Sequence, residues 1–481
     1  MNKQIHEPRN LTMLTDFYQL TMMDGYLSSG IHEEIATFDL FFRQRGQINY
    51  AVAAGLEQAI EYIQDLHFSA EDIEYLRSLN TFTDKFLDYL KDLRFTGDIY
   101  SVREGEIVFP MEPIMIVRAP LIEAQLVETA LLTIISHQTL IATKASRVTT
   151  AAGEGKVIEF GLRRAQGPDA GVYGSRASII GGASATSNVL AAQMFDIAPK
   201  GTHSHSWVLS FPTELDAFNA FADIYPDSCL LLVDTYDTLR SGVPNAIKVF
   251  DRLKKEGHKP LGIRLDSGDL AYLSKKARKM LDEAGYPDAV IFASNDIDEN
   301  LVNALNAQGA KIDMYGVGTK LITSDGMPSL GGVYKLAEII RDGKSVPRLK
   351  KSDSIEKITN PGFKTVYRIY EKESGKAFAD LIALKGEKLV KPLTLTHETE
   401  RWKKTTLEDY DSKELLVKVF ENGKLVYDVP TIKESSQYRH DELARFWDEY
   451  KRLVNPHIYK VDLSDGLYEL KQRMLLNGDK A

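Results

Sequence analysis

Cysteine is nearly absent from this chain. Its 481 residues include a single cysteine, Cys229, which lies in the apolar run 229–233. One thiol can form neither an internal disulfide framework nor a cysteine metal cluster. We therefore expect Cys229 to be a buried core residue.

Long apolar runs and an excess of positive charge are also missing. No stretch reaches the roughly 18 consecutive apolar residues that a membrane-spanning helix requires, and residues 1–7 lack the hydrophobic region of a signal peptide. The formal net charge of −9 argues against non-specific binding of nucleic acid, although a local basic pocket for phosphates is compatible with it. We expect a cytoplasmic protein that binds neither membranes nor nucleic acid.

The chain is long and apolar enough, with 43% hydrophobic residues, to fill two or three cores. Residues 1–150 mix helical and short strand patterns, which predicts an α+β N-terminal domain. Residues 151–345 alternate short apolar runs with amphipathic stretches, and residues 346–481 return to lysine-rich turns and hairpin patterns. The sequence thus predicts an α/β domain that carries the active site, followed by a C-terminal extension.

The alternation in the central region is typical of a parallel sheet with helical connections. The expected strands cover 157–161, 202–209, 229–235, 261–266, 290–294 and 314–318, and the expected helices cover 184–194, 213–224, 245–255, 270–284 and 299–308. Polar residues and glycines follow each apolar run, which favours a (β/α) barrel over a doubly wound sheet. Either fold places its functional site at the carboxyl ends of the strands.

Two histidines stand out in the segment 200–210. On a strand over 202–209, His203 and His205 share one face. At a strand end, one of them could bind a metal, act as a general base, or attack phosphorus as a nucleophile. The alternative is a structural histidine with satisfied hydrogen bonds.

Other strand ends carry groups that suit a phosphorylated sugar. Phe160 with Arg163 and Arg164 offers an aromatic surface beside cations that pair with carboxylate or phosphate. Asp234 ends an apolar run, whereas Asp237 is better explained as a helix cap.

The later strand ends add carboxylate and glycine. Arg264 and Asp266 alternate on one face, and such carboxylates suit sugar hydroxyls or Mg²⁺. Glycines at 316, 318, 331 and 332 let backbone N–H groups come close to a phosphate. The combined set fits transfer of a phosphosugar with pyrophosphate as the leaving group, which demands charge stabilisation.

Five segments in this order resemble the nicotinate phosphoribosyltransferase family: 15–19 with Tyr18, 160–169, 201–206, 264–269 and 316–319. The resemblance implies a type II phosphoribosyltransferase fold, an irregular α/β barrel joined to an N-terminal domain, and a homodimer with shared active sites. It also implies that nicotinate and phosphoribosyl pyrophosphate give nicotinate mononucleotide and pyrophosphate, a step in NAD biosynthesis. ATP would be a co-substrate, hydrolysed through a phosphohistidine, and we expect Mg²⁺ as cofactor.

The resemblance also assigns residues. It selects His205 as the phosphohistidine and leaves His203 at a variable position. It places around nicotinate Tyr18, Phe160, Arg163, Thr202 and Arg264. It places Asp266 at the ribose hydroxyls and, at phosphate, Gly318, Thr319, Gly331 and Gly332. Asp234 is our own inference for the catalytic group that orients His205.

Nicotinate is favoured over nicotinamide because a spare arginine at 163 or 164 pairs with a carboxylate but gains little from a neutral amide.

Two other functions compete with this interpretation. A metal-dependent amidohydrolase could use His203 and His205 as a metal pair, but it needs more histidines on later strands, and His258 alone lies between 206 and 390. A non-catalytic nucleotide-binding protein could use the same pocket, because barrels host many functions. The full set of polar strand-end residues argues against it, and measured turnover decides the question.

Overall fold

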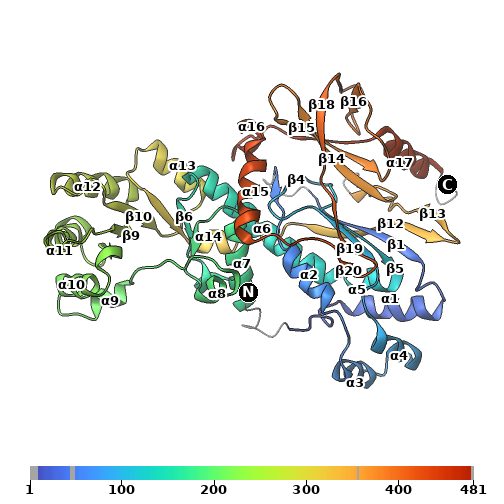
Figure 1. The fold of residues 1–481 in the computed structure, drawn as a ribbon, viewed down its shortest axis with the longest axis horizontal. Coiled ribbons are helices and arrows are strands. Elements are labelled where there is room, and N and C mark those ends of the chain that lie inside the picture. The colour runs from blue at the N-terminus through green and yellow to red at the C-terminus, as the bar shows by residue number, and fades with distance from the viewer. Residues whose placement is uncertain (1–8, 44–48, 355–356, 478–481) are drawn as a thin grey trace. The chain divides into compact units, whose positions relative to one another are not determined.

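The chain folds into two compact units. The computed structural model describes residues 9–43, 49–354 and 357–477 (Figure 1). Met1–Leu140 and Ser329–Ala481 form one unit, here called the terminal unit, and Ile141–Pro328 form the other, the central unit. The sequence divided the chain into three consecutive domains, whereas the structure joins the first and last segments in one unit.

Strand pairing explains why the two ends of the chain fold together. The terminal unit contains a seven-stranded sheet. Its order is β13 (Lys344–Pro347), β12 (Gly332–Arg341), β1 (Ile35–Phe42), β5 (Met115–Pro120), β3 (Asp98–Ser101), β19 (Val417–Glu421) and β20 (Lys424–Leu425). β1 pairs antiparallel with β5 on one side and with β12 on the other, and β3 pairs with β19. Hydrogen bonds of one sheet therefore join segments far apart in sequence.

Smaller sheets and helices complete the terminal unit. A four-stranded sheet has the order β18 (Tyr410–Glu414), β14 (Lys364–Glu371), β15 (Ala377–Leu384) and β21 (Lys460–Leu463). Two-stranded pairs are β16 (Leu393–Thr396) with β17 (Lys404–Leu407) and β2 (Ala51–Val52) with β4 (Ile107–Val108). The helices are α1 (Phe17–Ser28), α2 (Leu56–Gln64), α3 (Ala70–Ser78), α4 (Asp84–Asp92), α5 (Leu121–Leu126), α15 (Ile432–Ala444), α16 (Asp448–Lys451) and α17 (Asp465–Asn477). The division between the units falls within α6 (Glu128–Ala152).

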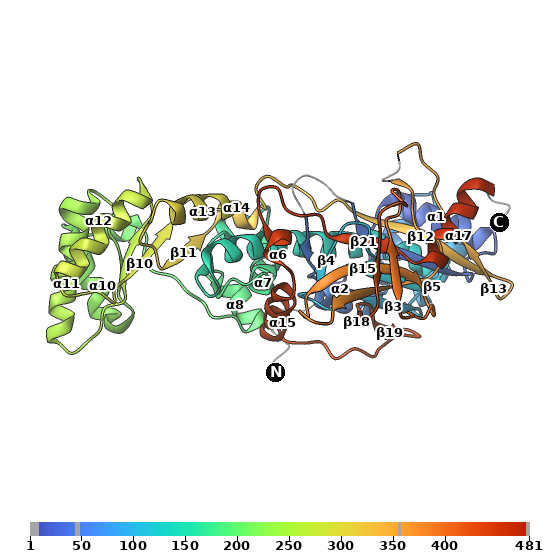
Figure 2. The ribbon, with the colours of Figure 1, turned by 90° about the horizontal axis from the view of Figure 1, so that it is seen from above.

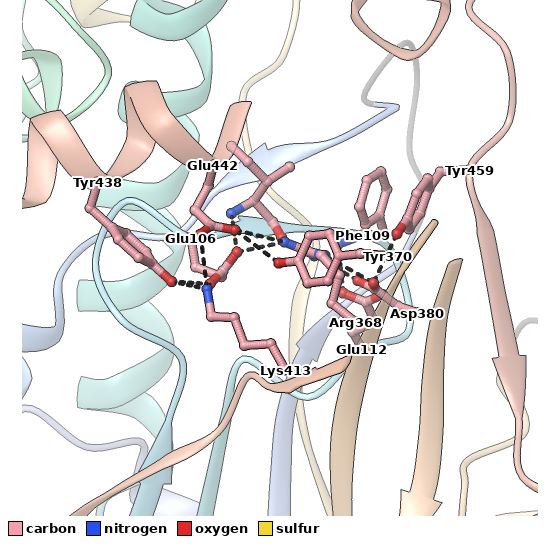
Figure 3. A network of polar contacts seen from close by, with 11 residues as sticks. Glu106, Phe109, Glu112, Arg368, Tyr370, Asp380, Lys413, Tyr438, Glu442 and Tyr459 are labelled. Carbon is pink, nitrogen blue, oxygen red and sulfur yellow. Dashed lines mark hydrogen bonds and ion pairs between the residues drawn. The ribbon is translucent and has the colours of Figure 1, made fainter. Parts of the chain in front are cut away.

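A buried ionic network also holds the N-terminal and C-terminal segments together (Figure 3). Arg368 of β14 is fully buried and donates from Nε and Nη2 to Asp380 of β15 at 2.9 and 2.6 Å. Its Nη1 lies 2.5 Å from Oε1 of Glu106, which precedes β4. The guanidinium also lies 4.9 Å from the ring of Phe446. A carboxylate from each end of the chain thus shares one cation.

Two further groups bind the second carboxylate oxygen of Glu106, Oε2. Lys413 Nζ lies 3.0 Å from Glu106 Oε2 and 3.1 Å from Glu442 Oε1, and the Tyr438 hydroxyl donates to Glu106 as well. Burial alone would raise the pKa of Glu106, yet Arg368 and Lys413 hold it below its ordinary value. Burial, reinforced by the charge of Asp380, raises the pKa of Glu112 well above its ordinary value. The network therefore favours the charged form of Glu106 and the neutral form of Glu112.

The central unit is built on a parallel sheet, as predicted. Its order is β7 (Ala185–Thr186), β6 (Val157–Glu159), β11 (Met314–Val317), β10 (Val290–Ser294), β9 (Gly262–Leu265) and β8 (Leu230–Leu232). Every neighbouring pair is parallel. The helices are α7 (Pro168–Ile180), α8 (Val189–Phe195), α9 (His205–Leu209), α10 (Glu214–Ile224), α11 (Val243–Lys255), α12 (Leu270–Glu283), α13 (Glu299–Ala307) and α14 (Thr319–Ile322). Helices α11 and α12 lie side by side (Figures 1 and 2).

The predicted barrel is not closed. From β8 to β11, and again from β6 to β7, strands that follow one another in the chain are neighbours, and β11 pairs with β6. This is the strand order of a barrel opened between β7 and β8, and these two strands do not pair in the described part of the chain. The segment around Pro199 forms a bridge with Thr186 of β7. His203 Nε2 accepts a hydrogen bond from Leu232 N of β8 at 3.3 Å. The segment between Pro199 and His203, which lies outside the strands, thus contacts both edge strands, β7 and β8.

The predicted strand over 202–209 is wrong, since this segment contains helix α9. Ser204 is the N-cap residue of α9. Within the helix, Trp207 Nε1 donates to Ala217 O of α10 at 3.0 Å, and Val208 is fully buried. Alternating polar and apolar residues fit a strand locally, but packing against α10 selects the helix. His203 and His205 therefore do not share a strand face.

None of the helices within the described residues combines the length and the apolar character needed to cross a bilayer.

Candidate functional site

Predicted site residues gather at one edge of the central sheet. Phe160 follows β6, Asp234 and Thr235 follow β8, Asp266 follows β9, and Gly318 follows β11. Because the strands are parallel, their carboxyl ends meet at the same edge, where loops can converge on a ligand. The prediction that these strand ends form a common edge is confirmed.

His205 is the first residue of α9 and contacts two neighbouring strand ends. Its Nδ1 lies 3.1 Å from Thr235 Oγ1, and its Nε2 lies 3.6 Å from Asp266 Oδ2. The side chain is 40% exposed, so a reactant can reach it. A carboxylate near one ring nitrogen stabilises the imidazolium and orients the ring, which suits a histidine that receives a group on its other nitrogen.

The structure corrects the predicted partner of His205. Asp234 Oδ2 accepts hydrogen bonds from Asp266 N at 3.0 Å and from Ser267 Oγ at 2.5 Å. It therefore fixes the backbone that carries Asp266, and the carboxylate beside the imidazole is Asp266. The two strand ends lie side by side, so the Asp266 N–H and the Ser267 hydroxyl, both after β9, occupy Asp234 Oδ2. Sequence alone could not show which neighbouring carboxylate faces the histidine.

Arg264 links the histidine segment to this carboxylate. Its Nη2 lies 3.6 Å from Asp266 Oδ1, and its Nη1 donates to His203 O at 3.4 Å. Burial lowers the pKa of Arg264, opposed by the charges of Asp266 and Asp234, and the nearby cation of Arg163 lowers it further. Two guanidinium groups that repel each other favour an anion between them.

His203 has a structural place rather than a reactive one. It is 7% exposed, and burial lowers its pKa to about 4. It is therefore neutral near pH 7 and accepts the hydrogen bond from Leu232 N described above. No group of three or more His, Cys, Asp or Glu in residues 9–43, 49–354 and 357–477 is arranged to hold a metal ion, so the two histidines do not form the pair that an amidohydrolase would need.

Phe160 is held at the exit of β6 by close packing. Its ring lies 5.6 Å from that of Phe292, centroid to centroid. Gly316 of β11 passes beneath both rings, and a Cβ on this residue would lie 2.6 Å from Phe160 Cδ2 and 2.7 Å from Phe292 Cε1. The position of the aromatic surface thus depends on a glycine in the neighbouring strand.

We expect Gly316→Ala to destabilise the protein by about 1–3 kcal/mol, because the added methyl group forces both rings to shift. Urea denaturation measures the change. Gly201→Ala is the control, since a Cβ there would meet nothing within 4 Å. Equal midpoints for the two variants would contradict the tight contact at Gly316.

The remaining predicted residues have the following positions. Thr202 Oγ1 accepts from His203 N, and Thr319 begins α14 directly after Gly318. Tyr18, Gly331 and Gly332 belong to the terminal unit. Burial and the Glu128 carboxylate raise the pKa of Tyr18 to about 12. The roles assigned to these residues stay predictions.

Sequence reasoning missed two residues at this edge. Thr235 contacts His205 Nδ1, and the hydroxyl of Ser294, the last residue of β10, donates to Asp266 Oδ1. Both stand at the carboxyl end of an apolar strand, and that position was the signal that could have found them.

Comparisons with known proteins agree on one family. The N-terminal domain model of nicotinate phosphoribosyltransferase matches residues 13–136, and the C-terminal domain model matches residues 363–471. The chain is 49% identical to nicotinate phosphoribosyltransferase of Bacillus subtilis, over 97% of this chain and 95% of that protein. It is 36% identical to the enzyme of the same name from Dictyostelium discoideum, over 97% and 88%. These two alignments extend over almost the whole chain, whereas the domain models match its two ends.

Solved structures show the same fold. The crystal structure of human nicotinic acid phosphoribosyltransferase is similar with a TM-score of 0.85 and 30% identity, covering 96% of this chain and 99% of that one. A nicotinate-nucleotide pyrophosphorylase from Pyrococcus furiosus gives a TM-score of 0.69 at 22% identity, over 92% and 99%. The mixed α/β fold is therefore shared by both proteins.

Proposed function

The chain belongs to the nicotinate phosphoribosyltransferase family, and from this premise we propose that it transfers the phosphoribosyl group of phosphoribosyl pyrophosphate to nicotinate. The products are nicotinate mononucleotide and pyrophosphate, and the reaction is a step in NAD biosynthesis. The observation that carries the proposal is the meeting of His205, Arg264 and Asp266 at one sheet edge, in a chain that matches the Bacillus subtilis enzyme along its length.

We assign the nicotinate subsite to the end of β6 and the segment before α9. Phe160 offers a ring on which a pyridine can stack. Arg163 and Arg264, whose charges repel each other, would hold the carboxylate between them, which favours nicotinate over nicotinamide. The family resemblance also assigns Thr202 and Tyr18 to nicotinate, and Tyr18 belongs to the terminal unit.

The phosphoribosyl subsite is assigned to the ends of β9 and β11. Asp266 would accept hydrogen bonds from the ribose hydroxyls, while Gly318 and Thr319 would hold phosphate. Gly331 and Gly332, which belong to the terminal unit, are assigned to phosphate by the family resemblance alone. Mg²⁺ fits this edge, because it prefers carboxylate and phosphate oxygens and Asp234 keeps Oδ1 buried with no hydrogen-bond partner in the described chain. When bound, the ion would neutralise the departing pyrophosphate.

ATP hydrolysis is proposed to proceed through His205. An imidazole nitrogen attacks the γ-phosphorus, its lone pair forms the P–N bond, and the P–O bond to ADP breaks. Water later cleaves the P–N bond and releases phosphate. Asp266 lies where it would stabilise the positive charge of the ring during both steps. We also propose, from the family resemblance, that the protein is a homodimer with shared active sites. The same proposal includes an irregular type II barrel and a cytoplasmic location.

The direct test measures nicotinate mononucleotide formation from nicotinate and phosphoribosyl pyrophosphate with Mg²⁺, with and without ATP. A parallel reaction with nicotinamide tests the choice of base. Product from nicotinate, increased by ATP, supports the proposal, and no product from either base refutes it.

We expect His205→Asn to abolish both ATP stimulation and labelling by γ-³²P-ATP, while a slow ATP-independent reaction persists. His258→Asn is the matched control, because His258 is a similarly exposed histidine of the central unit that pairs with Asp227. His203→Asn should also keep the label, since its imidazole is buried. Labelled protein after His205→Asn would contradict the assignment.

A further inference from the structure

A buried carboxylate lies directly before the aromatic residue of the proposed nicotinate subsite. Glu159 is the last residue of β6 and is fully buried. Its Oε1 accepts a hydrogen bond from Gly161 N, and its Oε2 accepts from Ser175 Oγ of α7 at 3.0 Å and from Thr186 Oγ1 of β7 at 2.6 Å. One side chain thus joins a strand end, a helix and a neighbouring strand.

The backbone around this carboxylate is fixed on both sides. Phe160 N donates to Val317 O at 2.8 Å, and Arg164 N donates to Gly161 O at 2.8 Å. Gly161 itself has no room for a side chain, since a Cβ would lie 2.5 Å from Ile322 Cβ. The N–H of Gly161 donates to Glu159, and Gly161 is the residue directly before the helical turn η1 (Leu162–Arg164). This turn contains Arg163 and so fixes the position of its backbone.

Burying a carboxylate at this position costs free energy, and only the hydrogen bonds that its two oxygens accept can offset that cost. The three donors are a peptide N–H and two hydroxyls, all neutral, and burial raises the pKa of Glu159 while these hydrogen bonds oppose the rise. An apolar side chain of similar size would fill the same space but leave the buried Gly161 N–H without an acceptor. Glu159 therefore holds the loop by hydrogen bonding and not by volume alone.

We propose that Glu159 is a positioning residue for nicotinate: through Gly161 it fixes the backbone that presents Phe160 and Arg163 to the base. This inference rests on the proposed function, because it names how the base subsite is held in place. Glu159 does not itself touch the substrate, and Ser175 and Thr186 act through it.

The test compares Michaelis constants in variants of the full-length enzyme. Glu159→Met removes the acceptor, and we expect it to raise KM for nicotinate about 10-fold or more, because small misplacements of binding groups have large effects. KM for phosphoribosyl pyrophosphate should change by less than about 2-fold, since that subsite is assigned to other strand ends. Glu159→Gln keeps an acceptor for Gly161 N and should recover most of the affinity.

A second pair of variants approaches the same contact from its partner. Thr186→Val has nearly the same shape but loses the hydroxyl that donates to Glu159 and accepts from Asn188 N. It removes both of these hydrogen bonds, and we expect it to raise KM for nicotinate about 3-fold. Thr186→Ser retains the hydroxyl and should behave like the parent enzyme. This pair decides the question if Glu159→Met does not fold.

Glu214→Met is the control for loss of a buried carboxylate. Glu214 is 5% exposed, begins α10 and accepts from Asn245 Nδ2 at 2.9 Å. It should lower the melting temperature without raising KM for nicotinate. Equal changes in both Michaelis constants for Glu159→Met, or no change in a folded variant, overturn the positioning role. An inactive parent enzyme would instead refute the proposed function, and the positioning role would fall with it.

Discussion

Asp266→Asn should lower kcat for nicotinate mononucleotide formation by about 10²- to 10³-fold, the usual effect of removing a group that stabilises charge in a transition state. Asp266 lies 3.6 Å from both His205 Nε2 and Arg264 Nη2 and accepts from Ser294 Oγ. Asparagine keeps the shape but loses the charge, so the His205 ring loses its carboxylate partner and Arg264 loses its counter-ion. Steady-state kinetics with saturating ATP measures the loss.

The matched control is Asp237→Asn at the same sheet edge. Asp237 accepts from Leu239 N and Arg240 N at 3.1 and 2.8 Å, which confirms it as a helix cap, and asparagine is an equally good cap. Its activity and melting temperature should stay close to those of the parent enzyme. A similar loss of kcat in both variants would show that acidic charge at this edge acts generally and that Asp266 has no special role.

Arg368→Met should destabilise the terminal unit by about 3–5 kcal/mol, because it leaves the buried carboxylate of Asp380 without its cation and Glu106 with Lys413 alone. Glu106 and Asp380 both bond directly to the Arg368 guanidinium, and Arg368 and Asp380 are fully buried. Methionine replaces much of the volume, so the loss reports mainly on unpaired charge. Equilibrium denaturation in urea, followed by tryptophan fluorescence, measures it.

Two comparisons separate charge from packing in that experiment. Arg341→Met removes an arginine of β12 that is 47% exposed and pairs with the 19% exposed side chain of Glu34. Because water reaches this pair, the substitution should change the midpoint only slightly. Adding Asp380→Asn to Arg368→Met removes one unpaired charge and should restore part of the stability. If the double variant is less stable than Arg368→Met, the loss comes from packing against Phe446 and not from the unpaired carboxylates.

Local patterns predicted the central unit well where strands and helices are regular. The strand expected over 290–294 matches β10, and the helix expected over 213–224 corresponds to α10, with Thr213 as its N-cap. The helix expected over 184–194 begins only at Val189, because Asn188 accepts from Ala191 N as a cap and β7 precedes it. Short irregular segments escaped prediction, since their conformation depends on neighbours distant in sequence.

The sequence by itself determined the family, the parallel sheet and the set of polar residues at its carboxyl edge, because periodicity and motif order are local properties of the chain. Only the tertiary structure decided that Asp266 rather than Asp234 faces His205, that His203 caps an open strand edge, and that Glu159 holds the loop of Phe160. It also decided that the two ends of the chain share one sheet and the charge of Arg368. Each of these depends on which strands lie side by side, and strand pairing joins residues whose separation in sequence carries no signal of their contact.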